Sequence, residues 1–460
     1  MKRVYIYLIL ISLIASSSKI KSQNADGNQL NISGKFIMDE RFLLKDPNEW
    51  AWNETRLSLN LDKKIEDNSK FYSEIWLRNI GLPKIASLSD LYNKGIVDPY
   101  NLEIREAYVQ LFGFLTKNLD ITIGRQHIAW GTADKLNPTS NLNPYDMEDI
   151  LDFGRQRGSD AINLNYYLNN DFSVQGVFIP FFQPANMPLG IFSNALNPEM
   201  ELPQGMVLKG LSDTILMPPY SLSQSSTSGI KFKGFMKGVD FSISYVSGID
   251  GLPYSTRNTL IPVDTIGGIN INSQLSFGRN HIIGADLATS IAGFGFWAEV
   301  AVFIPKQSIE MITDLSALFS WPPNTMYKDS LILDKKKYIK CIAGGDYFFA
   351  DGSYVNLQYM HGFIHERGDE NLNDYFFLQY EKRFFNEKLK IAPISGGFIV
   401  TDWKEVKDNY ALVYMPEIAY KASRNTELSL STAIFEGKGD NLFSNLKDYN
   451  MLIFKMKYDF

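Results

Sequence analysis

The stretch that decides the fold is MLIFKMKYDF, Met451–Phe460, at the end of the printed sequence. One face of this stretch carries apolar and aromatic side chains, namely Leu452, Phe454, Met456, Tyr458 and Phe460. The other face carries Ile453, Lys455, Lys457 and Asp459. Successive side chains of a β-strand point to opposite faces, so this alternation predicts an amphipathic strand that ends on an aromatic residue.

The opposite end of the sequence predicts export. Lys2 and Arg3 precede a short apolar run, Val4–Ala15, and small and polar residues follow it. This order is typical of a secretory signal peptide, and the run is too short to span a membrane as a helix. A buried N-terminal helix is the alternative. We expect residues 1–22 to be the signal peptide and residues 23–460 to form a single domain.

The composition excludes several classes of protein. No apolar run of about 18 residues follows the predicted signal peptide, so no helical membrane span is expected. The net charge is −6, and loss of the four signal-peptide cations would make it about −10, which argues against a nucleic-acid partner. Cys341 is the only cysteine, so no internal disulfide can form.

The two ends together predict an outer-membrane β-barrel. The strand that closes on Phe460 resembles the signal by which the barrel-assembly machinery of Gram-negative bacteria recognises its substrates. Alternating segments of about 9–11 residues, the length of a membrane strand, recur along the chain. In one of them Leu57 and Leu59 alternate with Arg56 and Ser58. In such a barrel the apolar face meets the outer-membrane lipids and the polar face lines the lumen.

The number of strands follows from the position of both ends. A direct count of alternating segments gives nineteen, but two periplasmic ends require an even number. The tight Ala292-Gly293 turn must be periplasmic, so Gly267–Phe277 and His281–Ile291 cannot be two full wall strands. We interpret the first as an external loop that leads into the second. The prediction is an all-β, transmembrane, antiparallel up-and-down barrel of eighteen strands, with sixteen as the alternative.

The same turn predicts a pair of like charges. If Ile291 pairs with Phe294, then Asp286 lies directly opposite Glu299 on the inner face. Two carboxylates in such a pair repel each other unless a cation is near or one of them holds a proton. We expect an Arg or Lys of the lumen to approach them, with Arg56, Arg78, Arg125, Arg155 and Arg157 as candidates. The alternative is that both acids face water.

Two long external loops are unusually apolar. Gln183–Ser225 is rich in Pro, Met and Leu, and in Lys306–Lys337 the residues Ile309, Ile312, Leu315 and Phe319 recur at helical spacing. Loops of this length and composition are not expected to float in water. We expect them to fold into the lumen or cap it, and one of them to constrict the channel.

Signals for an enzyme are weak. The sequence has no Gly-x-Ser-x-Gly motif, no phosphate-binding glycine loop and no cysteine pair for zinc. His361 and His365 share a strand face at the external end of a strand, but rim histidines bonded to neighbours explain them better than a metal site. We expect no catalytic activity, no cofactor and no metal.

The stretch from Gly124 to Asp146 carries the most distinctive polar residues. Strict alternation would place Arg125 in lipid, so the strand must bulge near Gly124 or leave the hydrocarbon layer by Arg125. The loop that follows combines several acids with Arg155 and Arg157, which predicts a salt-bridged plug or a polar eyelet. A loop ordered by ion pairs without any substrate contact is the alternative. The predicted lumen or constriction residues are Arg56, Glu74, Arg78, Glu106, Arg125, Gln126, Trp130, Asp134, Arg155, Arg157, Asp286 and Glu299.

Several of these motifs resemble a family of outer-membrane barrels akin to the alginate-export porins. The matching residues are Arg105, Glu106, Ala107 and Tyr108, then Gly124, Arg125, Gln126, Trp130 and Gly131, and later Gly284, Ala285, Asp286 and Glu299. The resemblance implies a passive channel that works beside an inner-membrane exporter and a periplasmic lipoprotein. It implies no particular substrate.

Three functions follow from the sequence. The first is a porin-like channel for polar or anionic solutes or an exported polysaccharide. The second is an outer-membrane transporter of lipid or other hydrophobic molecules, with an apolar cavity that opens laterally. The third is a structural or adhesin barrel whose lumen is sealed.

Overall fold

The computed structural model describes residues 30–45, 49–66, 68–82, 85–152, 154–196, 202 and 205–460. The predicted signal peptide lies outside these residues. Within them, no helix is long and apolar enough to cross a membrane.

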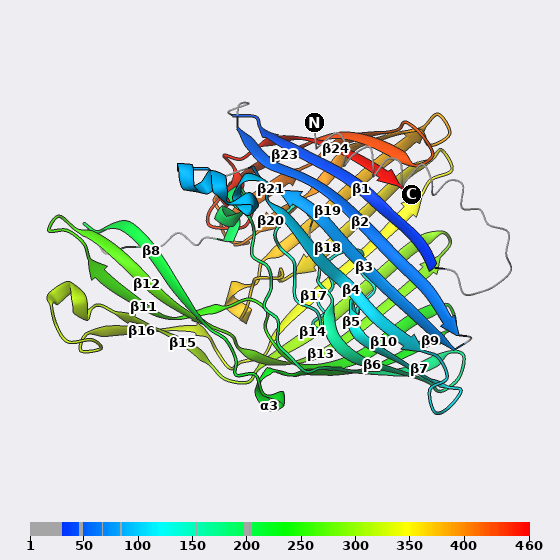
Figure 1. Cartoon of the computed structure of the whole chain (residues 1–460), viewed down its shortest axis with the longest axis horizontal. Coiled ribbons are helices and arrows are strands. Elements are labelled where there is room, and N and C mark those ends of the chain that lie inside the picture. Colours follow the sequence, from blue (N-terminus) through cyan, green and yellow to red (C-terminus); the bar gives the residue numbers. More distant parts are fainter. Residues whose placement is uncertain are drawn as a thin grey trace.

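The main body is a closed antiparallel β-barrel (Figure 1). Each wall strand pairs with the next one, and β1 pairs with β24 to close the ring. The wall strands are β1 (Leu30–Leu43), β2 (Trp50–Glu66), β3 (Ser69–Ile80), β4 (Tyr100–Leu111), β5 (Leu119–Gln126), β6 (Ser159–Tyr167), β7 (Phe172–Ile179), β9 (Thr227–Met236), β10 (Val239–Ile249), β13 (Arg279–Ile291), β14 (Phe294–Pro305), β17 (Tyr338–Phe348), β18 (Ser353–His361), β19 (Asp374–Phe384), β20 (Leu389–Val400), β21 (Tyr410–Tyr414), β22 (Glu417–Lys421), β23 (Thr426–Lys438) and β24 (Met451–Asp459).

The wall has eighteen strands, because β21 and β22 are two halves of one strand. Both halves pair with β20 on one side and with β23 on the other. Pro416 lies between them, and a proline cannot donate a hydrogen bond to a ladder. The prediction of an eighteen-stranded antiparallel barrel is confirmed, and the sixteen-stranded alternative is wrong.

The two ends of the barrel differ in the length of their connections. At one end, which we call the turn end, tight turns join neighbouring strands. Ala292 and Gly293 both adopt positive φ there, the conformation that a two-residue hairpin requires. The long connections lie at the other end, which we call the loop end. They contain short helices: η1 (Leu88–Tyr92), α2 (Lys94–Val97), η2 (Gly190–Leu196), α3 (Leu222–Ser225), η3 (Ser316–Phe319), η4 (Asp369–Asn371) and η5 (Ser444–Leu446).

The outer face of the wall is apolar. Exposed aliphatic side chains alternate with buried polar ones along the strands, for example Ile162 with Asn163 on β6 and Leu357 with Asn356 on β18. Exposed aromatic residues gather near the turn end, among them Tyr166, Phe235, Phe294, Phe348 and Phe385. An apolar band with an aromatic girdle is the outer surface that a barrel presents to lipid.

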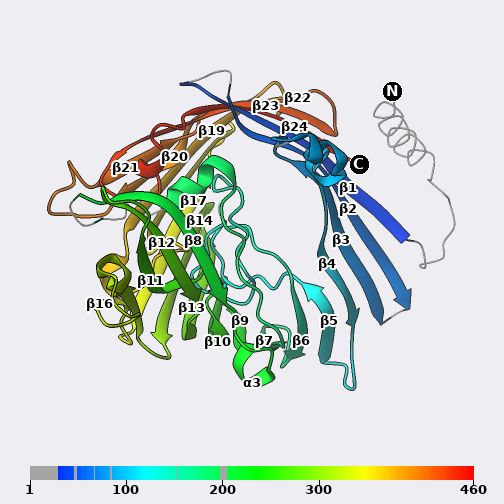
Figure 2. The same ribbon diagram turned by 60° about the vertical axis from the view of Figure 1, so that its left-hand side comes forward.

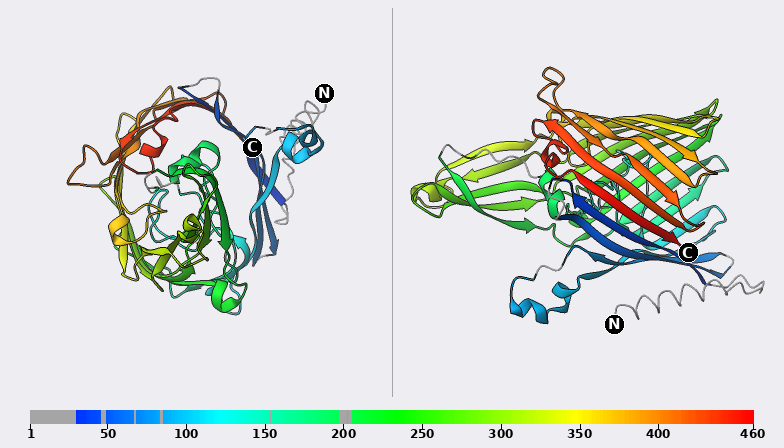
Figure 3. Two further views of the ribbon diagram at one scale, coloured as in Figure 1. Left: turned by 90° about the vertical axis from the view of Figure 1, so that its left-hand side faces the viewer. Right: turned by 90° about the horizontal axis from the view of Figure 1, so that it is seen from above.

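A second, five-stranded sheet projects from the loop end (Figures 1 and 3). Its strands are β8 (Val207–Leu216), β11 (Tyr254–Pro262), β12 (Gly268–Ser276), β15 (Ile309–Asp314) and β16 (Tyr327–Leu333), in the order β16-β15-β11-β12-β8. We call it the outer sheet. β12 lies in it, which confirms that Gly267–Phe277 is not a wall strand.

The outer sheet corrects the expectation for the two apolar loops. Lys306–Lys337 contributes β15 and β16 to the outer sheet, with η3 between them, so the prediction that this loop folds into the lumen or caps it is wrong. Ile309 and Ile312 both lie in β15, where residues three apart point to opposite faces, so their spacing did not indicate this strand. Gln183–Ser225 is divided, since its β8 lies in the outer sheet while its η2 packs against the barrel.

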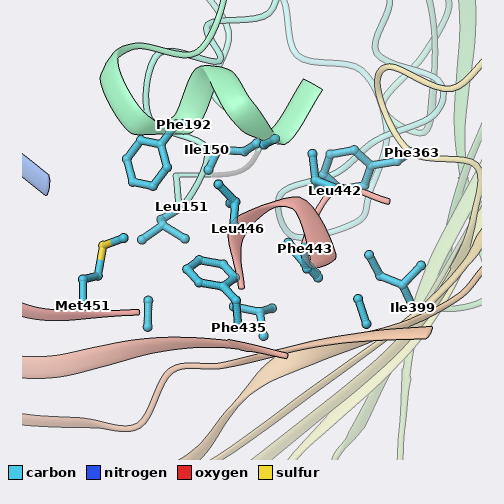
Figure 4. Close-up of a cluster of buried hydrophobic side chains, with 14 of the residues drawn as sticks. Ile150, Leu151, Phe192, Phe363, Ile399, Phe435, Leu442, Phe443, Leu446 and Met451 are labelled. Carbon is cyan, nitrogen blue, oxygen red and sulfur yellow. The ribbon is translucent and has the colours of Figure 1, made fainter. Parts of the chain in front are cut away.

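The apolar interior lies at the loop end of the barrel. Figure 4 shows Phe192 of η2 and Ile150 and Leu151 of an inward loop facing Phe435 and Phe443. All five side chains are buried. The lumen at this level is therefore packed with side chains from three different connections.

Candidate functional site

The connection between β5 and β6, residues 127–158, enters the lumen (Figure 2). We call it the inner loop. Its side chains contact wall strands on several sides of the barrel, from β1 to β18. Side-chain contacts hold it there, because its described residues make only isolated β-bridges. The inner loop is the candidate functional site.

A buried ion pair fixes the inner loop to β1. The guanidinium of Arg41 is 0 % exposed and donates two hydrogen bonds to Asp149, at 2.8 and 2.5 Å. Arg41 also donates to Asp39 on its own strand, at 2.8 and 2.9 Å. A two-pronged contact of this kind fixes both the position and the orientation of the carboxylate.

Trp76 of β3 is the centre of a second set of contacts. Its indole nitrogen donates to Glu74 at 2.6 Å. Four guanidinium groups lie 4.1 to 5.9 Å from its ring centroid, and they belong to Arg56, Arg78, Arg105 and Arg155. A cation over an indole face is attracted by the electron-rich ring, so Trp76 helps to hold these charges together in the lumen.

Acids separate the four guanidiniums. The acids around Arg78 are Glu54 at 3.1 Å, Glu103 at 3.0 Å and Glu148 at 2.6 Å. Glu148 belongs to the inner loop, so Arg78 is a second anchor for that loop. Arg56 lies at 3.7 Å from Glu54 and completes the group.

Asp146 of the inner loop is a third anchor. Its carboxylate is 0 % exposed and lies 2.7 Å from Arg105 and 3.0 Å from Arg155. Burial by itself raises the pKa of Asp146, but the guanidiniums of Arg155 and Arg105 outweigh it and hold this pKa below its usual value. Burial also raises the pKa of Asp149, but Arg41 outweighs this effect, and the pKa of Asp149 is held below its usual value as well. Both carboxylates are therefore charged at neutral pH.

Glu299 of β14 anchors the inner loop on the opposite wall. It accepts hydrogen bonds from the backbone nitrogens of Thr132 at 2.6 Å and Ala133 at 2.7 Å, and from the hydroxyl of Thr139 at 2.8 Å. Gly131 permits this approach, because a Cβ there would lie 2.5 Å from a Glu299 oxygen and its φ is +96°. The glycine of the Trp130-Gly131 pair is therefore explained by its close contact with Glu299.

Asp286 and Glu299 are direct cross-strand partners, as predicted. The cation near this pair is a lysine, Lys231, as the prediction of an Arg or Lys allowed, and not one of the five candidate arginines. Glu299 is held by inner-loop donors, while Asp286 accepts from the Ser242 hydroxyl and lies 3.9 Å from Lys231. The five predicted arginines do not make these contacts because they lie on, or bond to, β2–β7 and the loops beside them. Sequence could not place them around the ring.

Trp130 and Asp134 attach the inner loop at two further points. The indole of Trp130 is buried and donates to Gln175 of β7 at 2.8 Å. The carboxylate of Asp134 accepts from Asn356 at 2.8 Å and from Gln358 at 3.1 Å, both on β18.

Gln126 and Glu106 shape the point where the chain leaves the wall. The side chain of Gln126 is buried, donates to the Ala161 carbonyl at 3.1 Å and accepts from Asn163 at 3.1 Å. Glu106 accepts from the backbone nitrogen of His127 at 2.9 Å. These bonds end β5 and direct the chain inward.

The bulge expected near Gly124 is absent. β5 pairs with β4 and β6 without a register shift. Gly124 accommodates the turn of the chain by its φ of +126° instead. Arg125 therefore stays on the outer face, 3.6 Å from Asp160 of the neighbouring strand. The prediction that Arg125 meets an acid of a neighbouring wall strand is confirmed, but the prediction that Arg125 lies in the lumen is wrong.

None of the acids that the structure describes lies within ion-pair distance of Arg157. Its guanidinium donates to the Pro184 carbonyl at 2.5 Å. Burial lowers the pKa of Arg157, although Asp146 opposes this effect. The predicted mixed-charge loop thus forms, with Arg155 inside the ion-pair network and Arg157 bound to backbone.

A cavity of about 90 Å³ lies between the inner loop and the wall. Its apolar lining includes Leu142, Phe182, Phe303, Tyr338 and Phe363. The polar groups at its edge include Asn280, Lys340 and the ion pair of Asp250 with Arg367, which has a nitrogen–oxygen distance of 2.6 Å. Arrangement of a few polar groups around an apolar space is typical of a small-molecule site.

The two histidines of HGFIHE do not meet. His361 lies 2.8 Å from Asp374, whereas His365 is half-buried beside Phe363. Burial lowers the pKa of His365 to about 3. In the part of the chain that the structure describes, no three His, Cys, Asp or Glu residues are grouped as metal ligands.

Sequence reasoning missed Arg41, Asp39, Asp250, Arg367 and Lys340. Arg41 and Asp39 are the two that a signal could have revealed, because they share the inward register of the alternating strand β1. Asp250, Arg367 and Lys340 depend on contacts between segments far apart in the sequence.

Comparison with known proteins gives a family but no activity. The model of the family described as "Protein of unknown function (DUF1302)" matches residues 96–433, which include the inner loop and most of the wall. The chain belongs to this family. No curated protein matches the sequence. The alginate-export porins stay a resemblance.

Three solved structures illustrate what the fold is similar to. Pseudomonas aeruginosa OccK11 (OpdR) is 7% identical, with a TM-score of 0.46, and the match covers 94% of this chain and 95% of that chain. The Salmonella typhi OmpF complex with daunomycin is 10% identical, with a TM-score of 0.41, and the match covers 95% of this chain and 99% of that chain. Vibrio cholerae OmpT, an outer membrane protein, is 9% identical, with a TM-score of 0.42, and the match covers 96% of this chain and 100% of that chain. At such values we draw no argument from them, and the barrel assignment rests on the strand pairing.

Proposed function

We propose that this protein is a porin-like outer-membrane channel whose lumen is gated by the inner loop. One observation carries the proposal: a closed wall with an apolar outer face surrounds a charged interior, and a loop held by side chains crosses that interior. A loop held by ion pairs and hydrogen bonds can be released without breaking the wall ladder. A loop that formed a strand of the wall could not.

The orientation follows from the connections. Tight turns at one end and long connections at the other are the pattern of an outer-membrane barrel, with the turns on the periplasmic side. The outer sheet then faces the outside of the cell. The packed part of the lumen lies on the same side.

The cargo that we propose is a small polar or anionic solute, with an exported polysaccharide as a larger variant. Both signs of charge face the lumen, which provides partners for ionic and hydroxyl-bearing solutes. The proposed partners are the outer-membrane lipids, the barrel-assembly machinery acting on β24, and a periplasmic lipoprotein or inner-membrane exporter.

Conductance tests the channel proposal. The full-length mature chain, refolded into planar bilayers in KCl, is expected to show brief, discrete openings, and the reversal potential in a salt gradient gives the preferred sign of ion. If neither the wild type nor a variant with a released inner loop conducts, the channel proposal is wrong and a sealed structural barrel is the better explanation.

A second candidate is the transport of hydrophobic or amphiphilic molecules. The cavity lined by Phe182, Phe303 and Tyr338 favours it, because such a surface does not suit a polar solute. Binding of a fluorescent amphiphile that competes with unlabelled amphiphile, and not with sugars, would distinguish this candidate from the first.

A further inference from the structure

The wall strand β4 is longer than the ladder it forms with β5. It pairs with β3 from Tyr100 to Leu111, but with β5 only from Ala107 to Leu111. β5 ends at Gln126, where the chain turns into the lumen (Figure 2). Along Leu102–Arg105, roughly 13 Å of strand at about 3.3 Å per residue, the described residues form no ladder on this side of β4. We call this part of the wall the notch.

Side chains close the notch instead of a ladder. The guanidinium of Arg125 crosses it, donating to the Ile104 carbonyl at 3.2 Å and to the Gln183 side chain at 3.3 Å. Arg105 donates to the Gln156 carbonyl at 3.0 Å. Gly158 passes so close to β4 that a Cβ there would lie 2.4 Å from the Arg105 carbonyl oxygen. The inner layer of the notch is thus irregular backbone from residues 155–158.

The notch lies within the apolar outer face. Leu102 is 71 % exposed and Ile104 is 50 % exposed, and both are on the outer face of β4. Irregular backbone is costly beside lipid, because lipid cannot satisfy its hydrogen bonds. Membrane proteins tolerate it where it is covered by protein or lines a cavity.

Gln183, which accepts a hydrogen bond from Arg125 at the notch, also lines the cavity. The cavity lining includes Tyr145, Ser159 and Gln183, which belong to the same region of the chain, together with Phe181 and Phe182. Phe181 is 52 % exposed, so the cavity lining reaches the molecular surface after β7. One end of the cavity lining, Phe181–Gln183, therefore lies at the molecular surface and in contact with the latch of the notch.

The notch also offers hydrogen-bond donors that are not in use. The Nε atoms of Arg125 and Arg157 are buried, and among the described residues neither has a hydrogen-bond acceptor. The nearest acid to Arg125, Asp160, is 3.6 Å away. An acceptor-rich head group such as a carboxylate would satisfy both nitrogens.

We infer that the notch between β4 and β7 is a lateral portal through which a carboxylate amphiphile with one alkyl chain inserts the end of that chain from the membrane into the cavity. The alkyl chain contacts the phenylalanines, and the head group contacts Arg125 and Arg157. Arg125 is the latch, since its guanidinium joins the two sides of the notch. The portal rests on the proposed outer-membrane location and adds a second route, for another class of cargo, to the gated channel.

Contact quenching tests the portal. The full chain carries Cys341→Ser and Leu142→Cys, and bimane on this new cysteine reports from inside the cavity. The protein is placed in phosphatidylcholine nanodiscs and mixed with 16-doxyl-stearate. We expect quenching, and we expect Arg125→Ala to raise its rate about tenfold, the effect of losing charge-assisted hydrogen bonds.

The matched control is Arg279→Ala. Arg279 also joins a wall strand to a loop by donating to backbone carbonyls, those of Gln224 and Ser226, but it lies on β13, away from the notch. Thr227→Cys, also in the cavity lining, replaces the label site if Leu142→Cys does not fold. The inference is overturned if doxyl-stearate does not quench, or if Arg125→Ala and Arg279→Ala change the rate equally. KCl conductance, recorded on the same variants, reports the channel separately.

Discussion

The ion pair between Arg41 and Asp149 predicts how firmly the inner loop is held. The substitution Asp149→Asn keeps the size of the side chain and removes its charge. Arg41 is 0 % exposed and keeps Asp39 at 2.8 Å, so the variant loses one of two buried partners. Breaking a buried pair costs about 3–5 kcal/mol, and the remaining partner places this case at about 3 kcal/mol. That free energy shifts the balance between held and released loop about 100-fold.

The assay is single-channel recording in planar bilayers at neutral pH. We expect the open probability of Asp149→Asn to rise by about two orders of magnitude, up to saturation, with the conductance of the open state unchanged. Asp448→Asn is the control, because its ion pair with Lys45 is exposed, with side chains 62 % and 73 % accessible. Heat-modifiable migration on gels checks that both variants form the barrel. An open probability equal to that of the wild type and of the control would refute the anchoring role of Asp149.

Three further predictions follow from the same site. The pKa values of Asp146 and Asp149 are lowered, so these carboxylates stabilise the held loop fully above the ordinary carboxyl pKa of 3.8 and lose this effect as the pH falls below it. The open probability should therefore rise between pH 4 and pH 2. An open probability that does not change with pH would contradict this. Gly131→Ala places a Cβ against Glu299 at a positive φ, which should destabilise the held loop by about 1–3 kcal/mol and speed its cleavage by an added protease. Cleavage at the wild-type rate would show that Gly131 is not needed to hold the loop. Phe192→Ala removes a fully buried ring from the packing at the loop end, at a cost of about 3–5 kcal/mol, and should increase the conductance of the open state; an unchanged conductance would show that η2 does not narrow the lumen.

The wall was predictable because its determinants are local. Alternation in β24 gives the faces of one strand, and the Ala292-Gly293 turn sets the register of β13 and β14 without reference to any distant residue. From that register the Asp286–Glu299 pair follows directly. The strand number needed one rule beyond the local pattern, since the count of alternating segments gave nineteen and the requirement for an even number removed one of them.

The site was predictable only in part, because its contacts are distant in sequence. The inner loop carries Asp149 and Glu148, but nothing in the sequence reveals that Arg41 and Arg78 face them. The outer sheet shows the same limit, since parallel pairing joins β8 to β12 and β11 to β15 across long separations. Arg125 shows a second limit of sequence reasoning. Sequence rules place a charged residue away from lipid, and they do not predict the break in the wall beside Arg125.

The outer sheet has a mechanical consequence. Its strands come from the connections β7–β9, β10–β13 and β14–β17, so one hydrogen-bonded sheet fastens the rims of six wall strands to one another. These six strands resist spreading as a unit under the lateral pressure of a bilayer. The strands from β1 to β6 contribute nothing to that sheet. Deformation of the barrel is therefore concentrated where the fastened arc ends and the wall ladder is shortest, between β4 and β7.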